Sequence, residues 1–187
     1  MRLHARFSAL FLVSLFCICG LVSTASAAPP SFSSTCPATS PVWVADFDQP
    51  LTYIVGNTYS SPLTENHHKF VNANDFEIWE HPSTGIQGAY GDNASVNGTL
   101  IYYPLDSNKD PQNNGEAWLF FIEFSSPSMD LKVYDKNGDP ISFTTDVAYN
   151  SSFSDHFNIY VHADAPIGSI LYRAPGNETI IVKTCAW

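Results

Sequence analysis

Ala117-Trp118-Leu119-Phe120-Phe121-Ile122-Glu123-Phe124 is the stretch of sequence that decides the fold. It is apolar throughout except for Glu123, and it is rich in aromatic and branched residues. A strand with only one buried face alternates between apolar and polar residues, whereas a strand buried on both faces is apolar at nearly every position. We therefore expect residues 117–124 to form a central strand that is covered on both sides.

Shorter apolar runs lie before and after this strand, separated by clusters of Gly, Pro, Asn, Asp and Ser, as in all-β proteins. Asp135-Lys136-Asn137-Gly138 is expected to be a hairpin turn in which Gly138 takes a positive φ. No amphipathic helix with caps is found after residue 27. The sequence predicts an all-β, single-domain, jelly-roll-like β-sandwich. The other expected strands are 42–47, 68–71, 76–79, 99–103, 129–134, 140–144, 153–161, 169–172 and 179–185.

The N-terminus has the pattern of a secretory signal peptide. Arg2 and Arg6 precede an apolar run of about 14 residues, too short to span a bilayer, and Ala25-Ser26-Ala27 is a small-residue cleavage pattern. We expect a signal peptide at residues 1–27, with cleavage after Ala28 as the alternative. A disordered segment at 28–35 and the β-sandwich domain at 36–187 should follow. The sequence thus predicts a secreted, extracellular protein with no membrane span.

Two cysteines remain after cleavage, Cys36 and Cys185, near the two ends of the mature chain. An oxidising compartment favours a disulfide between them. Bridged Cα atoms lie about 4.4–6.8 Å apart, so the first and last strands should be neighbours. Four Asn-x-Ser/Thr sites in loop-like contexts also predict N-glycosylation, provided that the secretory pathway is eukaryotic: Asn93, Asn97, Asn150 and Asn177.

The acidic net charge argues against anionic partners. Removing the signal peptide takes Arg2 and Arg6 away and changes the formal net charge from −10 to −12. Nucleic acids and anionic membranes need a basic face, so neither is an expected partner. A glycan or another cell-wall component is compatible with this charge, and we expect a monomer.

The pattern resembles the secreted galactose-binding-like and carbohydrate-binding jelly-roll domains. The resemblance lies in the aromatic strand 118–124, the break Ser125-Ser126-Pro127, and the strand and turn of residues 131–138. It implies a β-sandwich fold. It also implies sugar binding by aromatic and polar loop residues, and a structural calcium ion in many members.

Histidine spacing does not indicate a metal site. His67 and His68 are adjacent, and His156 and His162 are too far apart along one strand to share an ion. No metal or other cofactor is expected, with calcium as the alternative. Oxygen ligands for calcium would come from Asp106, Asn108 and Asp110, although Pro111 stands where an EF-hand loop requires Gly.

Carboxylates and aromatic residues define the two candidate sites. If the protein cleaves glycans, Glu123 acting with Glu77 or Glu116 would supply the paired carboxylates. If it binds them, the face of strand 153–161 opposite the core would do so, because sugar rings stack on aromatic side chains. The expected ligand-binding residues are Trp79, Tyr134, His156, Asn158, Tyr160 and His162.

The sequence therefore favours a secreted, N-glycosylated, non-catalytic β-sandwich that binds carbohydrate or another extracellular or cell-surface component. Two alternatives remain open. One is a small jelly-roll hydrolase or lyase that uses paired carboxylates. The other is a structural or interaction protein of the cell wall or secretome.

Overall fold

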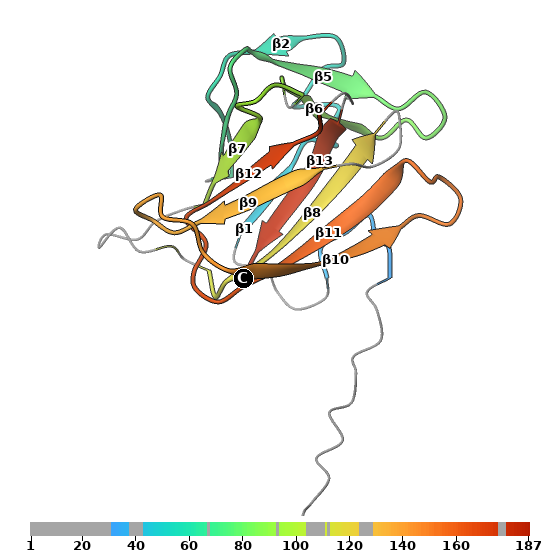
Figure 1. Ribbon diagram of the computed structural model, residues 1–187. Helices are drawn as coiled ribbons and strands as arrows, with labels where there is room; N and C mark the ends of the chain where they lie inside the picture. Colours follow the sequence, from blue (N-terminus) through green and yellow to red (C-terminus); the bar gives the residue numbers. More distant parts are fainter. Residues whose placement is uncertain are drawn as a thin grey trace, which may run out of the picture.

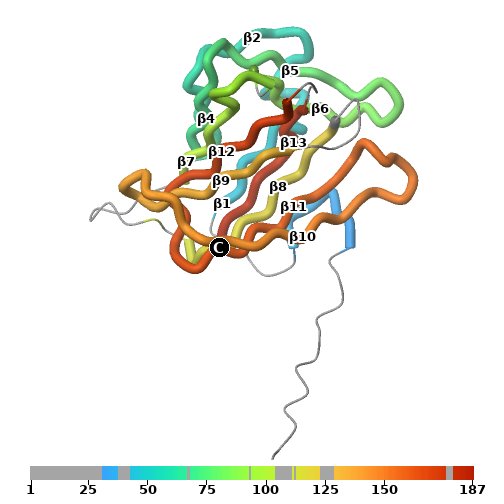
Figure 2. The backbone as a smooth tube through the Cα atoms, in the orientation of Figure 1, coloured from blue at the N-terminus to red at the C-terminus, as the bar shows by residue number. Residues whose placement is uncertain are grey.

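The computed structural model describes residues 31–37, 43–66, 68–92, 94–103, 111, 113–123, 129–175 and 179–187 (Figures 1 and 2). Within these ranges the chain forms strands, and no helix has the length and apolar character needed to cross a membrane. The strands are β1 (Trp43–Asp46), β2 (Thr58–Tyr59), β3 (Leu63–Glu65), β4 (His68–Val71), β5 (Phe76–Glu80), β6 (Gln87–Tyr90), β7 (Thr99–Tyr102), β8 (Glu116–Glu123), β9 (Asp130–Tyr134), β10 (Phe143–Tyr149), β11 (His156–Ala163), β12 (Ser169–Arg173) and β13 (Thr179–Ala186).

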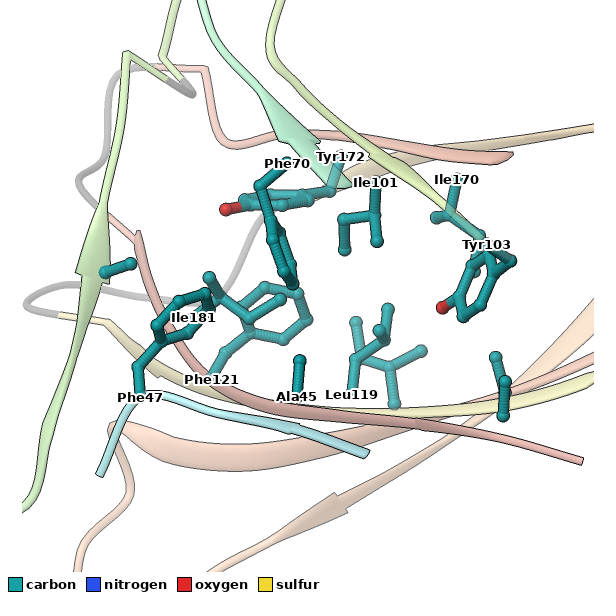
Figure 3. Packing of buried hydrophobic residues seen from close by; sticks show 14 of the residues in the cluster. Ala45, Phe47, Phe70, Ile101, Tyr103, Leu119, Phe121, Ile170, Tyr172 and Ile181 are labelled. Carbon is teal, nitrogen blue, oxygen red and sulfur yellow. The ribbon is translucent and has the colours of Figure 1, made fainter. Parts of the chain in front are cut away.

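The strands form two antiparallel sheets, which confirms the predicted all-β sandwich. The large sheet has the order β10-β11-β8-β13-β6-β5-β2, with β1 also paired to β13. The small sheet has the order β3-β4-β7-β12-β9. Inward-facing side chains of both sheets fill the space between them (Figure 3). Phe70, Ile101 and Tyr172 of the small sheet meet Leu119 and Phe121 of the large one.

Strand β8 lies in the middle of the large sheet, between β11 and β13. Its inner side chains, Leu119 and Phe121, belong to the core between the sheets. Its outer side chains pack into a second apolar group, here called the outer cluster: Trp118, Phe120, Ile122, Ile180, Val182 and Cys185. All of these are buried. The prediction of a central strand covered on both sides is therefore confirmed.

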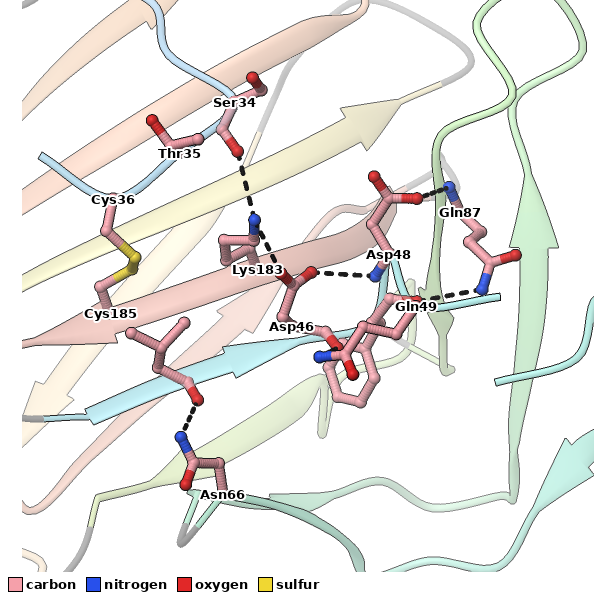
Figure 4. Close-up of polar contacts among 12 residues, drawn as sticks. Ser34, Thr35, Cys36, Asp46, Asp48, Gln49, Asn66, Gln87, Lys183 and Cys185 are labelled. Carbon is pink, nitrogen blue, oxygen red and sulfur yellow. Dashed lines mark hydrogen bonds and ion pairs between the residues drawn. A yellow bond between two sulfur atoms is a disulfide. The ribbon is translucent and has the colours of Figure 1, made fainter. Parts of the chain in front are cut away.

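A bulge in β13 lets two strands share one of its edges. The pairing register shifts between Ile181 and Lys183, so that β6 pairs before the bulge and β1 pairs after it. Val182 belongs to the outer cluster, and Lys183 reaches the same side to bind Asp46 of β1, with Nζ 2.8 Å from Oδ2 (Figure 4). The extra residue of a bulge places two successive side chains on one face.

The disulfide joins Cys36 to Cys185, with the Cα atoms 6.2 Å apart (Figure 4). Val44 of β1 lies opposite Cys185 in the sheet, so the prediction that the first and last strands are neighbours is confirmed. Cys36 itself precedes β1. The bridge holds residues 31–37 against the outer cluster, where Phe32 meets Phe120 edge to face at a ring distance of 5.4 Å.

The segment predicted to be disordered, 28–35, is described in part. Residues 28–30 lie outside the described residues, whereas residues 31–35 lie beside the outer face of the large sheet. Ser33 N donates to Asn158 Oδ1 at 2.7 Å, and Lys183 Nζ donates to Ser34 O at 3.4 Å. Residues 31–37 thus cover part of the outer cluster.

The expected return strand at 140–144 is wrong. Pro140 makes a single bridge to Tyr134, and the chain then crosses to the large sheet as β10. The two hydrogen bonds of this bridge flank the proline, from Asp135 N to Asp139 O and from Ile141 N to Val133 O, so the bridge itself needs no N–H from Pro140. Strands β2, β3 and β6 were not predicted, because two of them are very short and β6, Gln-Gly-Ala-Tyr, has little strand propensity.

Candidate ligand-binding groove

A groove of about 490 Å³ lies on the outer face of the small sheet. Its floor comes from β7, β12 and β9, and one wall comes from the turn of residues 135–138. This face points away from the core, because Ile101, Val133 and Ile170 on the same strands point inward. The alternation of these strands therefore leaves every second side chain for the groove.

Two tyrosines flank a small residue in this groove. Ser169 of β12 pairs with Tyr102 of β7 on one side and with Tyr134 of β9 on the other. Ser169 is only 6% exposed, whereas Tyr102 is 41% exposed and Tyr134 is half-buried. A short side chain between two long ones leaves a trough. The side chains of Leu100 and Leu171, which are paired in the sheet, form the apolar part of its lining.

The turn after β9 supplies the polar wall. The Asp135 carboxylate accepts hydrogen bonds from Asn137 N at 2.8 Å and Asp139 N at 2.9 Å. These backbone donors, Asp139 first, outweigh the effect of burial and hold the pKa of Asp135 below its ordinary value. Gly138 has a φ of 87°, as the sequence predicted for this turn.

Gly168 allows this wall to stand close to β12. A Cβ at this position would lie 2.3 Å from the carbonyl oxygen of Asp135, which is backbone and has no flexible end to move. Gly168 N donates to Tyr134 O at 2.8 Å, and Tyr103 N donates to Gly168 O at 3.1 Å. The absent side chain therefore sets the distance between the turn and the floor of the groove.

The groove combines aromatic rings, apolar floor and polar groups. Lys69 Nζ lies 5.5 Å from the centre of the Tyr102 ring, next to the groove, and Asn97 and Asn137 contribute amides to its lining. Such a set of groups suits a ligand with apolar ring faces and several hydroxyl groups.

Among the described residues that line the groove, Asp135 is the one carboxylate. Glycoside cleavage by the usual mechanism needs two carboxyl groups.

Of the predicted ligand-binding residues, the groove contains Tyr134. Trp79 lies on β5 of the large sheet, 38% exposed, with its ring edge to face with Tyr90 at 6.2 Å. The structure therefore does not bring Trp79 and Tyr134 to one surface.

Tyr103, the neighbour of Tyr102 in sequence, points into the core (Figure 3). Burial there raises the pKa of its hydroxyl, and Thr184 Oγ1 lies 3.3 Å from that hydroxyl.

The expectation of an exposed binding face on β11 is wrong for most of its length. Phe157, Ile159 and Val161 do point into the core, as predicted, but the opposite face is covered by residues 31–37 and the turn after β5. The four predicted residues on this face differ in exposure. His156 and Asn158 are fully buried. Tyr160 is half-buried with its hydroxyl 3.4 Å from Ser31 O, and His162 is exposed beside Asp146.

The three candidate catalytic carboxylates are not brought together. Glu116 and Glu123 lie at opposite ends of β8, about 23 Å apart at the rise of a strand. Glu77 of β5 is separated from the β8 backbone by two intervening strands, or about 14 Å. Paired carboxyl groups in glycosidases stand about 5–9.5 Å apart. The side chain of Glu123 lies outside the described part of the molecule.

Several other predicted residues cannot be placed. The calcium candidates Asp106, Asn108 and Asp110, and the glycosylation candidates Asn93 and Asn177, lie outside the described residues. Asn97 is exposed beside the groove, and Asn150 is half-buried in the loop after β10. Glycosylation at these positions stays a prediction.

Sequence reasoning missed Ser169, Asp135 and Gly168 as parts of a site. Each is an ordinary turn or strand residue in its own context, and each gains its place in the groove through pairing between β12 and its neighbours. The one available signal was a tyrosine near the end of each of two predicted strands, Tyr102 in 99–103 and Tyr134 in 129–134. No protein-family model matches this chain, and no curated protein matches it.

Proposed function

We propose that this protein is a secreted, non-catalytic β-sandwich that binds carbohydrate or another hydroxyl-rich component of an extracellular surface, and that the groove of the small sheet is its binding site. The observation that carries the proposal is the row Tyr102–Ser169–Tyr134, with an aromatic ring on each side of a small residue. Secretion is supported by the signal-peptide pattern and is compatible with the disulfide.

The groove favours binding over cleavage. Its tyrosines offer ring faces and hydroxyls. Its turn offers the Asp135 carboxylate, which is held by backbone N–H groups, and the Asn137 amide, which donates to that carboxylate at 3.1 Å. A groove whose walls are held in place loses little entropy on binding. The glycan-cleaving alternative lacks a second carboxylate among the described lining residues. The structural or interaction role would need no such groove.

The experiment is a glycan array followed by pull-down on insoluble cellulose, chitin and xylan, with the purified protein at micromolar concentration and calcium present. Oligosaccharides that bind are then titrated by calorimetry. We expect millimolar to micromolar dissociation constants, and we expect Tyr102→Ala and Tyr134→Ala each to weaken binding at least tenfold. Each tyrosine contributes stacking area that alanine cannot replace.

Tyr149→Ala is the matched control, because Tyr149 is half exposed but lies on β10 of the large sheet. It should bind as the wild type does. Absence of binding to every glycan and polysaccharide would refute the proposal. Binding that survives both groove substitutions would move the site elsewhere on the molecule.

A further inference from the structure

Outside the groove, two histidines and an aspartate meet at one end of the large sheet. His81 follows β5, and Asp155 and His156 lie where the β10–β11 loop enters β11. His81 Nε2 lies 3.0 Å from Asp155 Oδ2, and His156 Nδ1 lies 2.8 Å from Asp155 Oδ1. Among the described residues, this is the one group of histidine, cysteine and acidic side chains whose ligand atoms are close enough to share a metal ion.

The contact is a product of the fold. In the large sheet, β5 and β11 are separated by β8, β13 and β6. The turn between β5 and β6 folds across the outer face, held by His81 N to Ile86 O at 2.8 Å and Gly85 N to His81 O at 2.9 Å. The rings of His81 and His156 then meet edge to face, with their centres 4.7 Å apart.

Thr84 holds the far side of both rings. Its Oγ1 lies 3.2 Å from His81 Nδ1 and 3.3 Å from His156 Nε2. In each ring, therefore, one nitrogen faces the Asp155 carboxylate and the other nitrogen faces the Thr84 hydroxyl. Metal-binding histidines have this arrangement, because an oxygen partner on the second nitrogen sets the tautomer and the orientation of the ring.

The surroundings limit the freedom of the ligands. His156 is fully buried and His81 is 6% exposed, while Asp155 is half-buried and open on one side. The ring of Phe153 lies against both histidines, with its centre 6.1 Å from His81 and 5.3 Å from His156. The loop that carries Asp155 is closed by His156 N to Phe153 O at 3.0 Å.

We propose that His81 Nε2, His156 Nδ1 and the Asp155 carboxylate bind a divalent transition-metal ion of the zinc class. Two imidazoles and a carboxylate suit zinc, copper, iron or nickel, and do not suit calcium or magnesium. Ligands at about 2.0–2.1 Å from a tetrahedral ion are about 3.3 Å apart, so the two histidine–aspartate separations need to grow by only a few tenths of an ångström. The ligand atoms of the three residues all lie within 4.8 Å of one another. The exposed side of Asp155 is where such a movement is easiest.

Binding would move the proton on both rings. With the ion on His81 Nε2, the proton of His81 lies on Nδ1 and is donated to Thr84 Oγ1, so the 3.3 Å contact from Ser83 N is given up. With the ion on His156 Nδ1, the proton of His156 leaves the nitrogen that faces Asp155, lies on Nε2 and is also donated to Thr84 Oγ1. The ion would join the β5–β6 turn to the β10–β11 loop, and three protein ligands leave a further position for water or a small ligand. The site lies on the large sheet, so it goes beyond the proposed function of the groove.

The test uses the full secreted chain, with its disulfide intact and without a polyhistidine tag, after dialysis against a chelator and then metal-free buffer. Cobalt(II) is titrated while the visible d–d absorption is followed, and zinc is then added to displace it. We expect one equivalent of cobalt to bind with a dissociation constant below 100 μM. Zinc should remove the absorption and raise the thermal midpoint of unfolding.

His81→Gln and Asp155→Asn test the ligands without altering the fully buried His156, and each should weaken cobalt binding at least tenfold. Thr84→Val should weaken it about 10- to 100-fold, and Thr84→Ser should restore it. The matched control is His162→Gln, which removes an exposed histidine from the same strand and should bind cobalt normally. Circular dichroism confirms that each variant is folded.

No binding by the wild type below 100 μM cobalt would overturn the proposal. So would unchanged binding by folded His81→Gln and Asp155→Asn proteins. Carbohydrate binding, measured on the same His81→Gln protein, should stay at the wild-type level, so failure of the metal site and failure of the groove are distinguishable.

Discussion

Tyr102 of β7 and Tyr134 of β9 stand at the same level of the small sheet, because both pair with Ser169 of the strand between them. The relationship depends on two registers at once. A slip of one residue in either pairing would turn one tyrosine toward the core. The aromatic groove is thus a property of the sheet rather than of either strand alone.

Filling the trough should weaken binding without unfolding the protein. Ser169→Leu adds apolar volume between the two tyrosines, on the outer face of β12, where the groove has room for it. We expect calorimetry to show at least a tenfold loss of affinity for any oligosaccharide bound by the wild type, with a thermal midpoint within a few degrees. Ser169→Ala is the control and should bind normally. Wild-type affinity in Ser169→Leu would place the ligand elsewhere.

The disulfide should contribute a large share of the stability. Cys36 and Cys185 are 149 residues apart in sequence, and a cross-link over such a long loop is worth about 4–5 kcal/mol in the chain-entropy model. The Cys36→Ala/Cys185→Ala double variant should lose about that amount in urea unfolding followed by tryptophan fluorescence. A loss below about 1 kcal/mol would mean that β1 and β13 stay associated in the unfolded chain even without the disulfide, so that the cross-link removes little further entropy.

Phe32 should stabilise the large sheet from outside. Its ring packs on Phe120 in the outer cluster and is half-buried, so Phe32→Ala should cost about 1–3 kcal/mol, less than the ~3–5 kcal/mol of a fully buried phenylalanine. The loss is measured by chemical denaturation. Leu51→Ala removes a fully exposed side chain and should change nothing. Equal stability of the Phe32 and Leu51 variants would show that residues 31–35 do not cover the sheet in solution.

The turn at Asp135 should respond to acid. Its pKa is lowered in the folded protein, chiefly by the hydrogen bond from Asp139 N, so its contribution to stability is complete above the ordinary aspartate pKa of about 4. That contribution is lost as the pH falls through the lowered folded value. Carboxyl NMR should show Asp135 titrating below the other exposed aspartates.

The isosteric Asp135→Asn variant provides the comparison for this pH dependence. It should be less stable than the wild type at pH 7, because its amide oxygen accepts the turn hydrogen bonds without a negative charge. The difference in unfolding free energy between the two proteins should shrink toward acid pH. A difference that stays constant from pH 7 to about pH 3 would contradict the assignment.

Some of the structure could be predicted because it depends on neighbours along the chain. Strand β8 is apolar at almost every position, so its burial on both faces followed from composition alone. The turn 135–138 follows from Asp, Asn and Gly at fixed offsets. The pairing of Cys36 with Cys185 followed because no third cysteine remains after the predicted cleavage.

The outer face of β11 shows where prediction from pattern stopped. The alternation correctly divided its residues between two faces. It could not show that Ser33 and its neighbours cover Asn158 from more than 120 positions away, or that the turn after β5 covers His156. Polar residues on an alternating strand look the same whether water or another segment lies above them. Exposure is decided by the rest of the chain.

The sequence by itself determined the all-β class, the central strand, the turn at Gly138 and the covalent link between the ends, because these depend on local periodicity, on backbone freedom and on the number of cysteines. Only the tertiary structure decided which side chains meet. It placed Tyr102 and Tyr134 on either side of Ser169 through the registers of three strands, and it placed His81 beside His156 through the turn after β5. No short stretch of sequence contains that information, because the energy of each contact is shared between strands distant in the chain.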